Sequence, residues 1–240
     1  YSIFNVLQKE FNFDLDKAKY FAGHSLGEYS ALSCAGYLKF SKTLMLLRCR
    51  GDAMQNAIPK GEGGMVAVLG STVEAIEKIL NDNKDDFLSE IANDNSDGQI
   101  VLSGKNNDLI KLTDVLKTNG IKNIKLPVSA PFHCKLMNNA TEIMEQEIKK
   151  INFEDSNKLL ISNVTADEIS DKDELKDLLI KQIESRVRWR ESVILMINKG
   201  VSHFIEIGPG KVLSGLVKRI NKNVKINSIN SETDIKDLKI

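Results

Sequence analysis

The sequence of 240 residues lacks what several classes of protein require. Its three cysteines, Cys34, Cys49 and Cys134, show no Cys-x-x-Cys spacing and predict neither a disulfide framework nor a metal site. The sequence has no apolar run long enough to cross a bilayer and no signal-peptide pattern. Its formal net charge of +0 argues against electrostatic binding of a nucleic acid. We therefore expect a cytoplasmic protein with no membrane or nucleic-acid partner and no metal.

Hydrophobic residues make up 42% of the sequence and charged residues 28%, a balance typical of globular proteins. The length suffices for one large domain or two small ones. The sequence begins at Tyr1, inside an expected helix over residues 1–12. We therefore expect a fragment that lacks its natural N-terminus.

Gly23, Ser25 and Gly27 form a Gly-x-Ser-x-Gly run, the most informative motif present. An apolar stretch, 20–22, precedes it as an expected strand, and a helix-like stretch, 28–38, follows. A serine on such a bend can stand exposed, and both glycines are expected because a Cβ would clash with the tight backbone. The helix start aims N–H groups at any oxyanion that forms there. Ser25 is thus a candidate nucleophile, with an ordinary turn as the alternative.

The middle of the sequence predicts a separate α/β unit. The expected order is β-α-β-β-α-β, typical of a ferredoxin-like subdomain, which we place at residues 61–127. Its expected elements are strand 65–70, a helix capped by Ser71 or Thr72 and ending near 83, strands 88–93 and 99–103, helix 106–119 and strand 121–127.

The flanking parts, 1–60 and 128–240, alternate strands with helices, which predicts an α/β core with a mainly parallel sheet. A helix over 42–57 is expected to be capped by Ser41. The later expected elements are helix 134–150, strand 159–163, helices 173–184 and 190–199, strand 203–207, helix 212–221 and strand 224–228.

Three histidines are candidate bases for Ser25. The side chain of His24, next to Ser25 on the bend, should diverge from the serine. His203 begins a predicted core strand and is expected to be structural or on the surface. His133 lies in a loop, 129–133, between a strand and a helix, where α/β folds place chemistry. It is the best candidate base, and the alternative is that it caps the helix over 134–150.

Arg50 is the second informative residue. Its neighbours one turn away on the expected helix are apolar, so we expect Arg50 on the inward face, without an acidic neighbour. Arg48 differs, because Asp52 lies four residues further on and can form a surface ion pair with it. A buried guanidinium needs a partner. That partner is either a carboxylate elsewhere in the fold or the carboxylate of a ligand, which arginine can hold in bidentate fashion.

Five segments together resemble the malonyl-CoA:acyl carrier protein transacylases of fatty-acid synthesis. The resemblance runs in order over nearly the whole sequence. The segments are Gly-His-Ser-Leu-Gly-Glu-Tyr-Ser-Ala-Leu at 23–32, Arg-Gly with Met-Gln at 50–55, Ser-Ala-Pro-Phe-His-Cys-x-Leu-Met at 129–137, Ser-Asn-Val-Thr-Ala at 162–166 and Glu-Ile-Gly-Pro-Gly-Lys-Val-Leu at 206–213. The fold that it implies is an α/β-hydrolase-like core with a ferredoxin-like insert.

The resemblance implies a role for each of seven residues. Catalysis would use Ser25 as nucleophile, His133 as base, the backbone carbonyl of Gln182 to orient His133, and the backbone N–H of Leu26 as an oxyanion donor. Substrate binding would use Arg50 for the malonyl carboxylate, Asn163 near the histidine, and Phe132, since a bulky residue before the histidine goes with malonyl in related polyketide acyltransferases.

The implied activity is that of an [acyl-carrier-protein] S-malonyltransferase of fatty-acid biosynthesis. Malonyl-CoA would acylate Ser25, and the 4'-phosphopantetheine thiol of acyl carrier protein would then accept the malonyl group, with no bound cofactor. We expect a monomer. The family's Gly-Gln-Gly-Ser-Gln segment, which completes the oxyanion site, does not occur in the sequence, so we expect the fragment alone to be impaired.

Three other functions stay open from the sequence. The first is the acyltransferase domain of a polyketide synthase, and the second is a serine esterase or thioesterase, which would use His203. The third is a carrier-protein-binding module without catalysis. A basic set could dock an acidic carrier protein or simply be a solvated face. Its members are Arg186, Arg188, Arg190, Lys211, Lys218 and Arg219.

Overall fold

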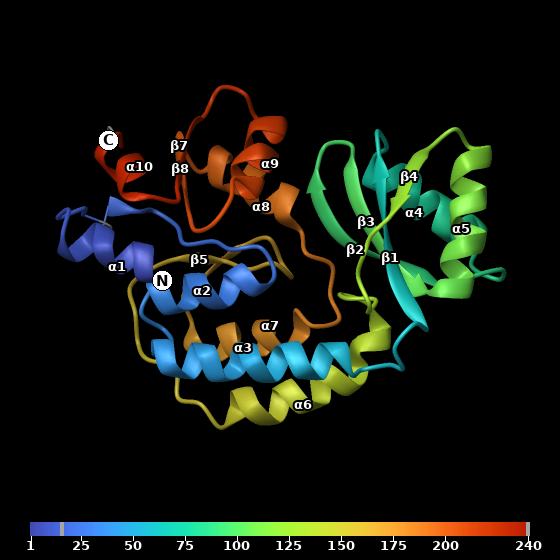
Figure 1. Ribbon diagram of the computed structural model, residues 1–240, viewed down its shortest axis with the longest axis horizontal. Coiled ribbons are helices and arrows are strands. Elements are labelled where there is room, and N and C mark those ends of the chain that lie inside the picture. Colours follow the sequence, from blue (N-terminus) through green and yellow to red (C-terminus); the bar gives the residue numbers. More distant parts are fainter. Residues whose placement is uncertain (15–16, 239–240) are drawn as a thin grey trace.

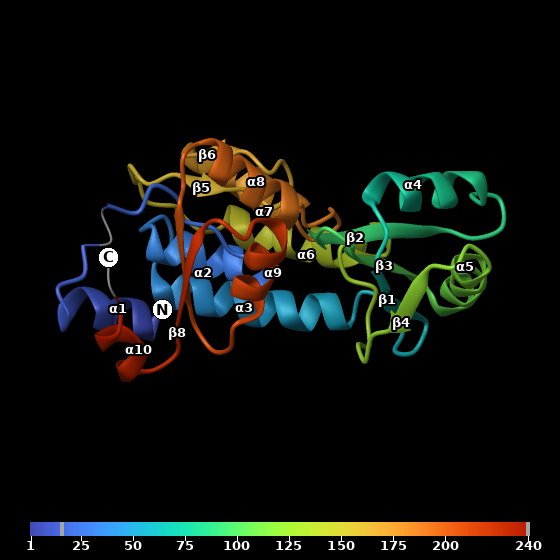
Figure 2. The ribbon, with the colours of Figure 1, turned by 90° about the horizontal axis from the view of Figure 1, so that it is seen from above.

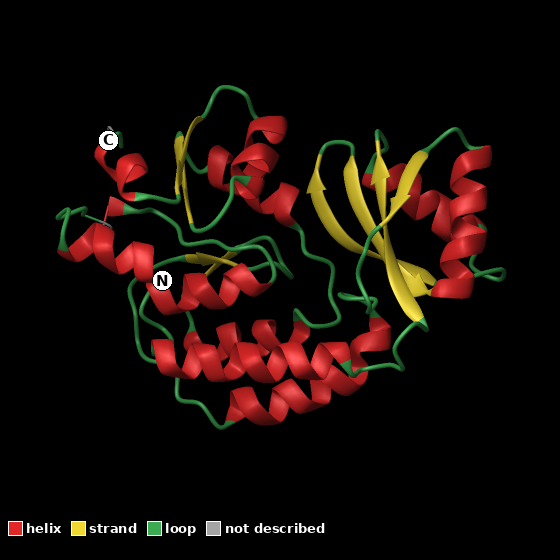
Figure 3. Ribbon diagram, in the orientation of Figure 1, coloured by secondary structure: helices red, strands yellow, loops and turns green. Residues whose placement is uncertain are grey.

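The computed structural model describes residues 1–14 and 17–238. It is an α/β structure in which two regions stand side by side (Figure 1). A four-stranded sheet with two helices forms the region on the right, and a larger region with most of the helices holds both chain ends on the left (Figure 3). Within the described ranges, no helix has both the length and the hydrophobicity needed to cross a membrane.

The four-stranded sheet is built from one continuous stretch of sequence. Its elements are β1 (Gly63–Leu69), α4 (Val73–Asp82), β2 (Ser89–Ser96), β3 (Gln99–Lys105), α5 (Asn106–Thr118) and β4 (Lys122–Lys125). The strand order is β2-β3-β1-β4, and each neighbouring pair is antiparallel, with Val66 opposite Leu102 in the central pair. As predicted, Thr72 caps α4 by accepting from the Ala75 N–H at 3.3 Å.

The two faces of this sheet have different partners because side chains alternate along a strand. On one face, Val66 and Val68 of β1 and Leu102 of β3 pack in one cluster with both helices, for example with Leu112 of α5. On the other face, Met65 packs in a cluster that includes the half-buried Phe132. The second face is therefore directed at the loop that carries His133.

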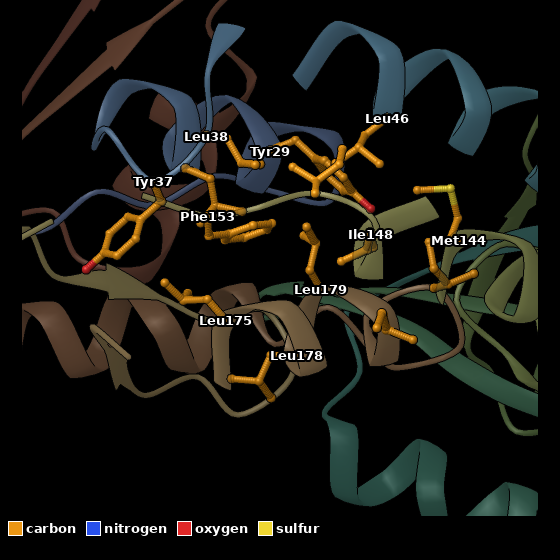
Figure 4. Packing of buried hydrophobic residues seen from close by; sticks show 14 of the residues in the cluster. Tyr29, Tyr37, Leu38, Leu46, Met144, Ile148, Phe153, Leu175, Leu178 and Leu179 are labelled. Atoms are coloured by element: carbon orange, nitrogen blue, oxygen red, sulfur yellow. The ribbon is translucent and has the colours of Figure 1, made fainter. Parts of the chain in front are cut away.

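Four helices form the main hydrophobic core of the larger region. They are α2 (Leu26–Cys34), α3 (Phe40–Gln55), α6 (Asn138–Lys149) and α7 (Lys172–Lys181). Tyr29, Leu46, Met144 and Leu179 from these helices are fully buried and meet in one cluster (Figure 4). This layer holds the N-terminus of α2, where Ser25 lies, over the C-terminus of α7, where Gln182 lies.

The remaining elements complete the region around a parallel strand pair. Strand β7 (His203–Ile207) pairs with β8 (Lys225–Ile229) in parallel, and α9 (Val212–Ile220) forms the crossover. Helix α8 (Trp189–Asn198) packs with α9. Helices α1 (Ser2–Lys9) and α10 (Glu232–Lys236) lie side by side at the end remote from the four-stranded sheet (Figure 2).

Strand β2 joins the four-stranded sheet to the larger region. Backbone hydrogen bonds run from the Asp94 N–H to the Val187 carbonyl at 2.9 Å and from the Val187 N–H to the Ala92 carbonyl at 2.8 Å. Nε of Arg190, on α8, lies 3.0 Å from both carboxylate oxygens of the buried Asp94. Backbone pairing and an ion pair therefore fix the sheet beside the core.

The predicted mainly parallel sheet is not what the described residues form. Their parallel strand pair is β7–β8, while β5 (Leu160–Ile161) pairs antiparallel with β6 (Glu168–Ile169). Phe21 makes one isolated parallel bridge to Leu160. That pairing stops after one bridge because residues 22–24 lead into the bend at Ser25, and because the Ser162 N–H closes a turn on the Asp167 carbonyl.

The strand predicted over 20–22 is only the isolated bridge at Phe21, and the predicted order of helices and strands otherwise agrees with the structure, with local corrections. Ser41 does not cap α3: the helix begins at Phe40, and the Lys39 carbonyl accepts from the Lys42 and Thr43 N–H groups. The helix predicted over 134–150 is a short 3₁₀ turn, η2 (Lys135–Met137), followed by α6. The sequence reading missed β6 and α10, which are short.

Candidate active site

Ser25 lies on a sharp bend between the segment of Phe21 and helix α2. Its backbone has φ 51° and ψ −106°, a conformation that a non-glycine residue rarely adopts. A Cβ on Gly23 would lie 2.0 Å from the Gly27 carbonyl oxygen, so the bend requires glycine at position 23. A Cβ on Gly27 would meet nothing within 4 Å. The prediction that the bend needs both glycines is therefore confirmed at Gly23 and wrong at Gly27.

His133 lies against the Ser25 hydroxyl. Its Nε2 is 2.8 Å from Ser25 Oγ, and its Nδ1 is 2.9 Å from the backbone carbonyl oxygen of Gln182. Because a carbonyl only accepts, Nδ1 carries the proton, and Nε2 is left to accept from the serine hydroxyl. The side chain therefore contacts the serine and does not cap the following helix.

The Gln182 carbonyl takes the place that an acidic residue has in a catalytic triad. Gln182 follows the last residue of α7, where helix carbonyls lack intrahelical partners and carry partial negative charge. This carbonyl fixes the tautomer of His133 and favours positive charge on the ring as Nε2 takes up a proton.

Burial keeps the His133 imidazole neutral. Loss of solvent and the positive charge of Arg50 lower the pKa of His133 from 6.5 to about 3. A neutral ring has a free lone pair at Nε2 near neutral pH. The site therefore holds its base in the form that can take a proton from Ser25.

Arg50 reaches the same serine oxygen from α3. Its Nη2 donates to Ser25 Oγ at 2.8 Å and to Gln182 Oε1 at 3.1 Å, and the residue is 7% exposed. Its Nε is buried without a hydrogen-bond partner among the described residues. Burial lowers the pKa of Arg50, and the nearby Tyr29 and Glu28 oppose that shift. The predicted contrast with Arg48 is confirmed, since Arg48 pairs with Asp52 on the surface at 2.9 Å.

Asn163 holds the bend in place. Its Oδ1 accepts from the Ser25 N–H at 2.7 Å, and its Nδ2 donates to the Gly23 carbonyl at 2.7 Å. The residue is fully buried and both polar atoms of its amide bond to the backbone of the bend, while its predicted part in substrate binding stays a prediction. Because Asn163 occupies the Ser25 N–H, the next donor at the helix start without a backbone partner among the described residues is the N–H of Leu26, a residue that is 53% exposed.

Glu28 is a residue of the site that the sequence reading missed. It is buried in the first turn of α2 and accepts from the Asn163 N–H and from Gln182 Nε2. Burial raises the pKa of Glu28 to about 7, while the hydrogen bonds from Gln182 and Asn163 and the charge of Arg50 act in the opposite direction. Its place in the sequence, three residues after the candidate nucleophile and on one helix face with it, is the signal that could have found it.

Phe132 and the other two histidines lie in three different settings. Phe132 is half-buried between the main core and the sheet, and its carbonyl accepts from Ser103 Oγ at 2.6 Å. His24 turns away from Ser25 to Asn95, with Nε2 to Oδ1 at 2.8 Å, as predicted. Nε2 of His203 lies 2.8 Å from Oδ1 of Asn227 on the neighbouring strand, as expected of a structural residue.

The predicted basic docking set is mostly engaged within the molecule. Arg186 pairs with Glu77, Arg188 with Glu191 and Arg190 with Asp94, and Arg219 donates to Gln99. Lys218 is exposed on α9, and Lys211 is exposed at the residue before that helix. No group of histidine, cysteine and acidic side chains suited to a metal occurs in the described part of the chain.

Comparisons with known proteins place the chain in a family. A family model described as "Acyl transferase domain" matches residues 16–237. The chain is 43% identical over 216 residues to a malonyl CoA-acyl carrier protein transacylase of Bacillus subtilis, covering 89% of this chain and 68% of that protein.

Solved structures of malonyl transacylases are also similar to this chain. The crystal structure of a malonyl CoA-acyl carrier protein transacylase from Clostridium perfringens is similar with a TM-score of 0.93 and 40% identity, covering 98% of this chain and 73% of that one. A malonyl-transacylase solved in complex with its type II PKS acyl-carrier protein is similar with a TM-score of 0.92 and 33% identity, covering 98% and 75%.

Proposed function

Because this chain belongs to the family of acyl transferase domains, we propose that it transfers a malonyl group from malonyl-CoA to acyl carrier protein in fatty-acid synthesis. The observation that carries the proposal is the pair of contacts at Ser25 Oγ, with His133 Nε2 and Arg50 Nη2 each at 2.8 Å. The first contact supplies a base for an acyl transfer, and the second supplies a cation beside the acyl group.

The first step forms an ester on the enzyme. His133 takes the proton of the Ser25 hydroxyl as the oxygen attacks the thioester carbonyl of malonyl-CoA. The carbonyl oxygen becomes an oxyanion, and the Leu26 N–H at the start of α2 is the donor that we assign to it. As the carbonyl re-forms, the carbon–sulfur bond breaks, and His133 returns its proton to the coenzyme A thiolate.

The second step is the same reaction with a different thiol. His133 takes the proton of the 4'-phosphopantetheine thiol of acyl carrier protein, and the thiolate attacks the malonyl ester. Ser25 leaves as an alkoxide and recovers its proton from His133, which restores the enzyme. Acyl transfer between two thiols changes no oxidation state, so the proposed mechanism needs no redox cofactor.

Arg50 selects the malonyl group in this account. The malonyl carboxylate lies one methylene beyond the acyl carbon, so a guanidinium that reaches Ser25 Oγ also reaches this carboxylate. An acetyl group would leave the buried cation without its anion, which is unfavourable. We assign to Phe132, beside His133, the role of restricting the space at the α-carbon of the acyl group.

The architecture that we infer is an α/β-hydrolase-like core, residues 1–60 and 128–240, with a ferredoxin-like subdomain at 61–127. The strand order β2-β3-β1-β4, with both helices packed on one face, supports the second part. The sharp bend at Ser25, between the bridge at Phe21 and helix α2, supports the first. We further propose a monomer, and a cytoplasmic location, since all three thiols are free.

A serine esterase or thioesterase is the rival that the bend alone would permit. Such an enzyme would use a triad acid and a histidine late in the chain, and His203 was the candidate. Nε2 of His203 bonds to Asn227, whereas the imidazole that contacts Ser25 Oγ is that of His133. A polyketide acyltransferase domain would share the site and differ in its neighbouring domains.

The test measures transfer to the carrier. Purified protein is given isotope-labelled malonyl-CoA and acyl carrier protein that bears the phosphopantetheine arm. We expect label on the carrier with wild-type protein and none with Ser25→Ala. Release of free malonate without carrier loading would support an esterase instead. Labelling of the carrier by Ser25→Ala would contradict the role of Ser25.

A further inference from the structure

Glu28 is a buried carboxyl group that the two acyl-transfer steps do not use. It is 3% exposed, and both of its oxygens are engaged at the site. Oε1 accepts from the Asn163 N–H at 3.2 Å, and Oε2 accepts from Gln182 Nε2. A carboxyl group is costly to bury. Glu28 nevertheless lies between the residue that holds the bend and the residue that orients His133.

Three neighbours decide the orientation of the Gln182 side-chain amide. Its Nε2 donates to Glu28 and, at 3.0 Å, to the Ser25 carbonyl, while its Oε1 accepts from Arg50 Nη2. Arg50 can only donate, and the other two neighbours accept. Half a turn of the amide would set N–H against N–H at Arg50 and oxygen against oxygen at Ser25. The amide therefore has one satisfied orientation, and Glu28, whose two oxygens both accept from N–H groups, is an acceptor that fixes it.

The same amide separates Glu28 from Arg50. No ion pair joins these two residues in the described structure, although each charge shifts the pKa of the other. A direct pair would neutralise the guanidinium and occupy the donors that a substrate carboxylate needs. With the amide between them, Arg50 Nε keeps an unused N–H in the buried site.

We propose that Glu28 is a positioning residue, which fixes the Gln182 amide as a neutral spacer and so orients Arg50 while leaving its guanidinium available to the substrate carboxylate. The inference rests on the proposed malonyl transfer. It assigns to Glu28 a part in the choice of malonyl over acetyl groups, through Gln182 and without contact to the substrate.

The test changes the hydrogen-bonding groups at positions 28 and 182, beginning with position 28. Glu28→Gln leaves one oxygen for two donors, the Asn163 N–H and Gln182 Nε2. With that oxygen on the Asn163 N–H, the new N–H group faces Gln182 Nε2, and the Gln182 amide turns and directs its own N–H group at Arg50. We expect malonyl-over-acetyl selectivity of Ser25 acylation to fall about 10-fold to 100-fold. The loss should fall on KM for malonyl-CoA more than on kcat, because Arg50 binds the carboxylate before and during the reaction.

The double variant Glu28→Gln/Gln182→Glu separates positioning from packing. It restores a donor and an acceptor between positions 28 and 182 but puts a carboxylate directly against Arg50. We expect its melting temperature to recover toward that of wild type while malonyl selectivity stays low. If Glu28→Gln does not fold, the double variant alone decides the question.

The control is Ser33→Ala, on the same helix, which removes a buried hydroxyl that has no hydrogen-bond partner in the described structure. It should keep its selectivity. Full selectivity in Glu28→Gln, or recovered selectivity in the double variant, overturns the proposal. Absence of malonyl on Ser25 in wild-type protein refutes the proposed function itself.

Discussion

At the scale of single residues, the hydroxyl oxygen of Ser25 has a neutral imidazole on one side and a guanidinium on the other. Sequence reasoning could identify these three residues because each carries a local signal: a Gly-x-Ser-x-Gly bend, a histidine in a loop after a strand, and an arginine on an apolar helix face. The position of Asn163 could not be derived in this way. Its partners at the bend lie 138 and 140 residues away in sequence, and no local pattern encodes that contact.

The protonation of His133 can be measured directly. We expect its ring to stay neutral well below the ordinary pKa of 6.5, because burial and Arg50 lower the pKa to about 3. A pH titration by NMR, with the resonance assigned by comparison with His133→Asn, should show no midpoint between pH 5 and 8 for this residue. A midpoint near 6.5 would contradict the buried, neutral base.

The lowered pKa of His133 also determines how this residue changes the free energy of unfolding with pH. Below pH 6.5 the unfolded chain binds a proton at His133, and the folded protein does not. This residue therefore lowers the free energy of unfolding as the pH falls from 6.5 toward 3, and it has no such effect above 6.5. Urea unfolding at several pH values should show a smaller decrease on the acid side in His133→Asn than in wild-type protein.

At the scale of elements, the bend before α2 decides where the Ser25 side chain points. The sequence predicted the bend and its helix, since glycine spacing and an apolar stretch are local features. It could not distinguish the two glycines, because only the folded path of the chain brings the Gly27 carbonyl against Gly23. The start of α3 was misplaced for a related reason: Ser41 matches the residue type of a cap, but Lys39 has the extended backbone that a cap requires.

The two glycines should respond differently to alanine. Gly23→Ala brings a methyl group to 2.0 Å from a backbone oxygen, and we expect a loss of more than about 3 kcal/mol in the free energy of unfolding. Gly27→Ala meets open space in a helix and should change that energy by less than about 1 kcal/mol. Chemical denaturation of both variants measures the difference, and similar losses would argue against the close contact at Gly23.

At the scale of the whole molecule, the site lies where the four-stranded sheet meets the helical core. The four-stranded sheet starts at Gly63 and ends at Lys125, and its strands and helices are continuous in sequence. The subdomain boundaries 61–127 stay a prediction. The prediction of a mainly parallel sheet was wrong because the alternation of strands and helices along the sequence does not determine which strands pair. The ion pair between Asp94 and Arg190, which joins the sheet to the core, links residues 96 positions apart in sequence. No local sequence pattern predicts this contact.

The joint can be tested through its ion pair. Arg190→Met leaves the buried Asp94 carboxylate unpaired, and we expect a loss of about 3 kcal/mol in the free energy of unfolding. The matched control is Arg48→Met, which breaks an exposed pair with Asp52 and should cost less than about 1 kcal/mol. Chemical denaturation compares the two. Equal losses would mean that the buried pair does not hold the sheet to the core.

The central claim is that malonyl is carried on Ser25 and chosen by Arg50. The most direct measurement is peptide mass mapping after brief exposure to equal amounts of malonyl-CoA and acetyl-CoA, without a carrier protein. We predict malonyl on the peptide that contains Ser25 in wild-type protein, no acyl group there in Ser25→Ala, and a loss of malonyl preference in Arg50→Ala. Malonyl on another residue, or an unchanged preference in Arg50→Ala, would contradict the account.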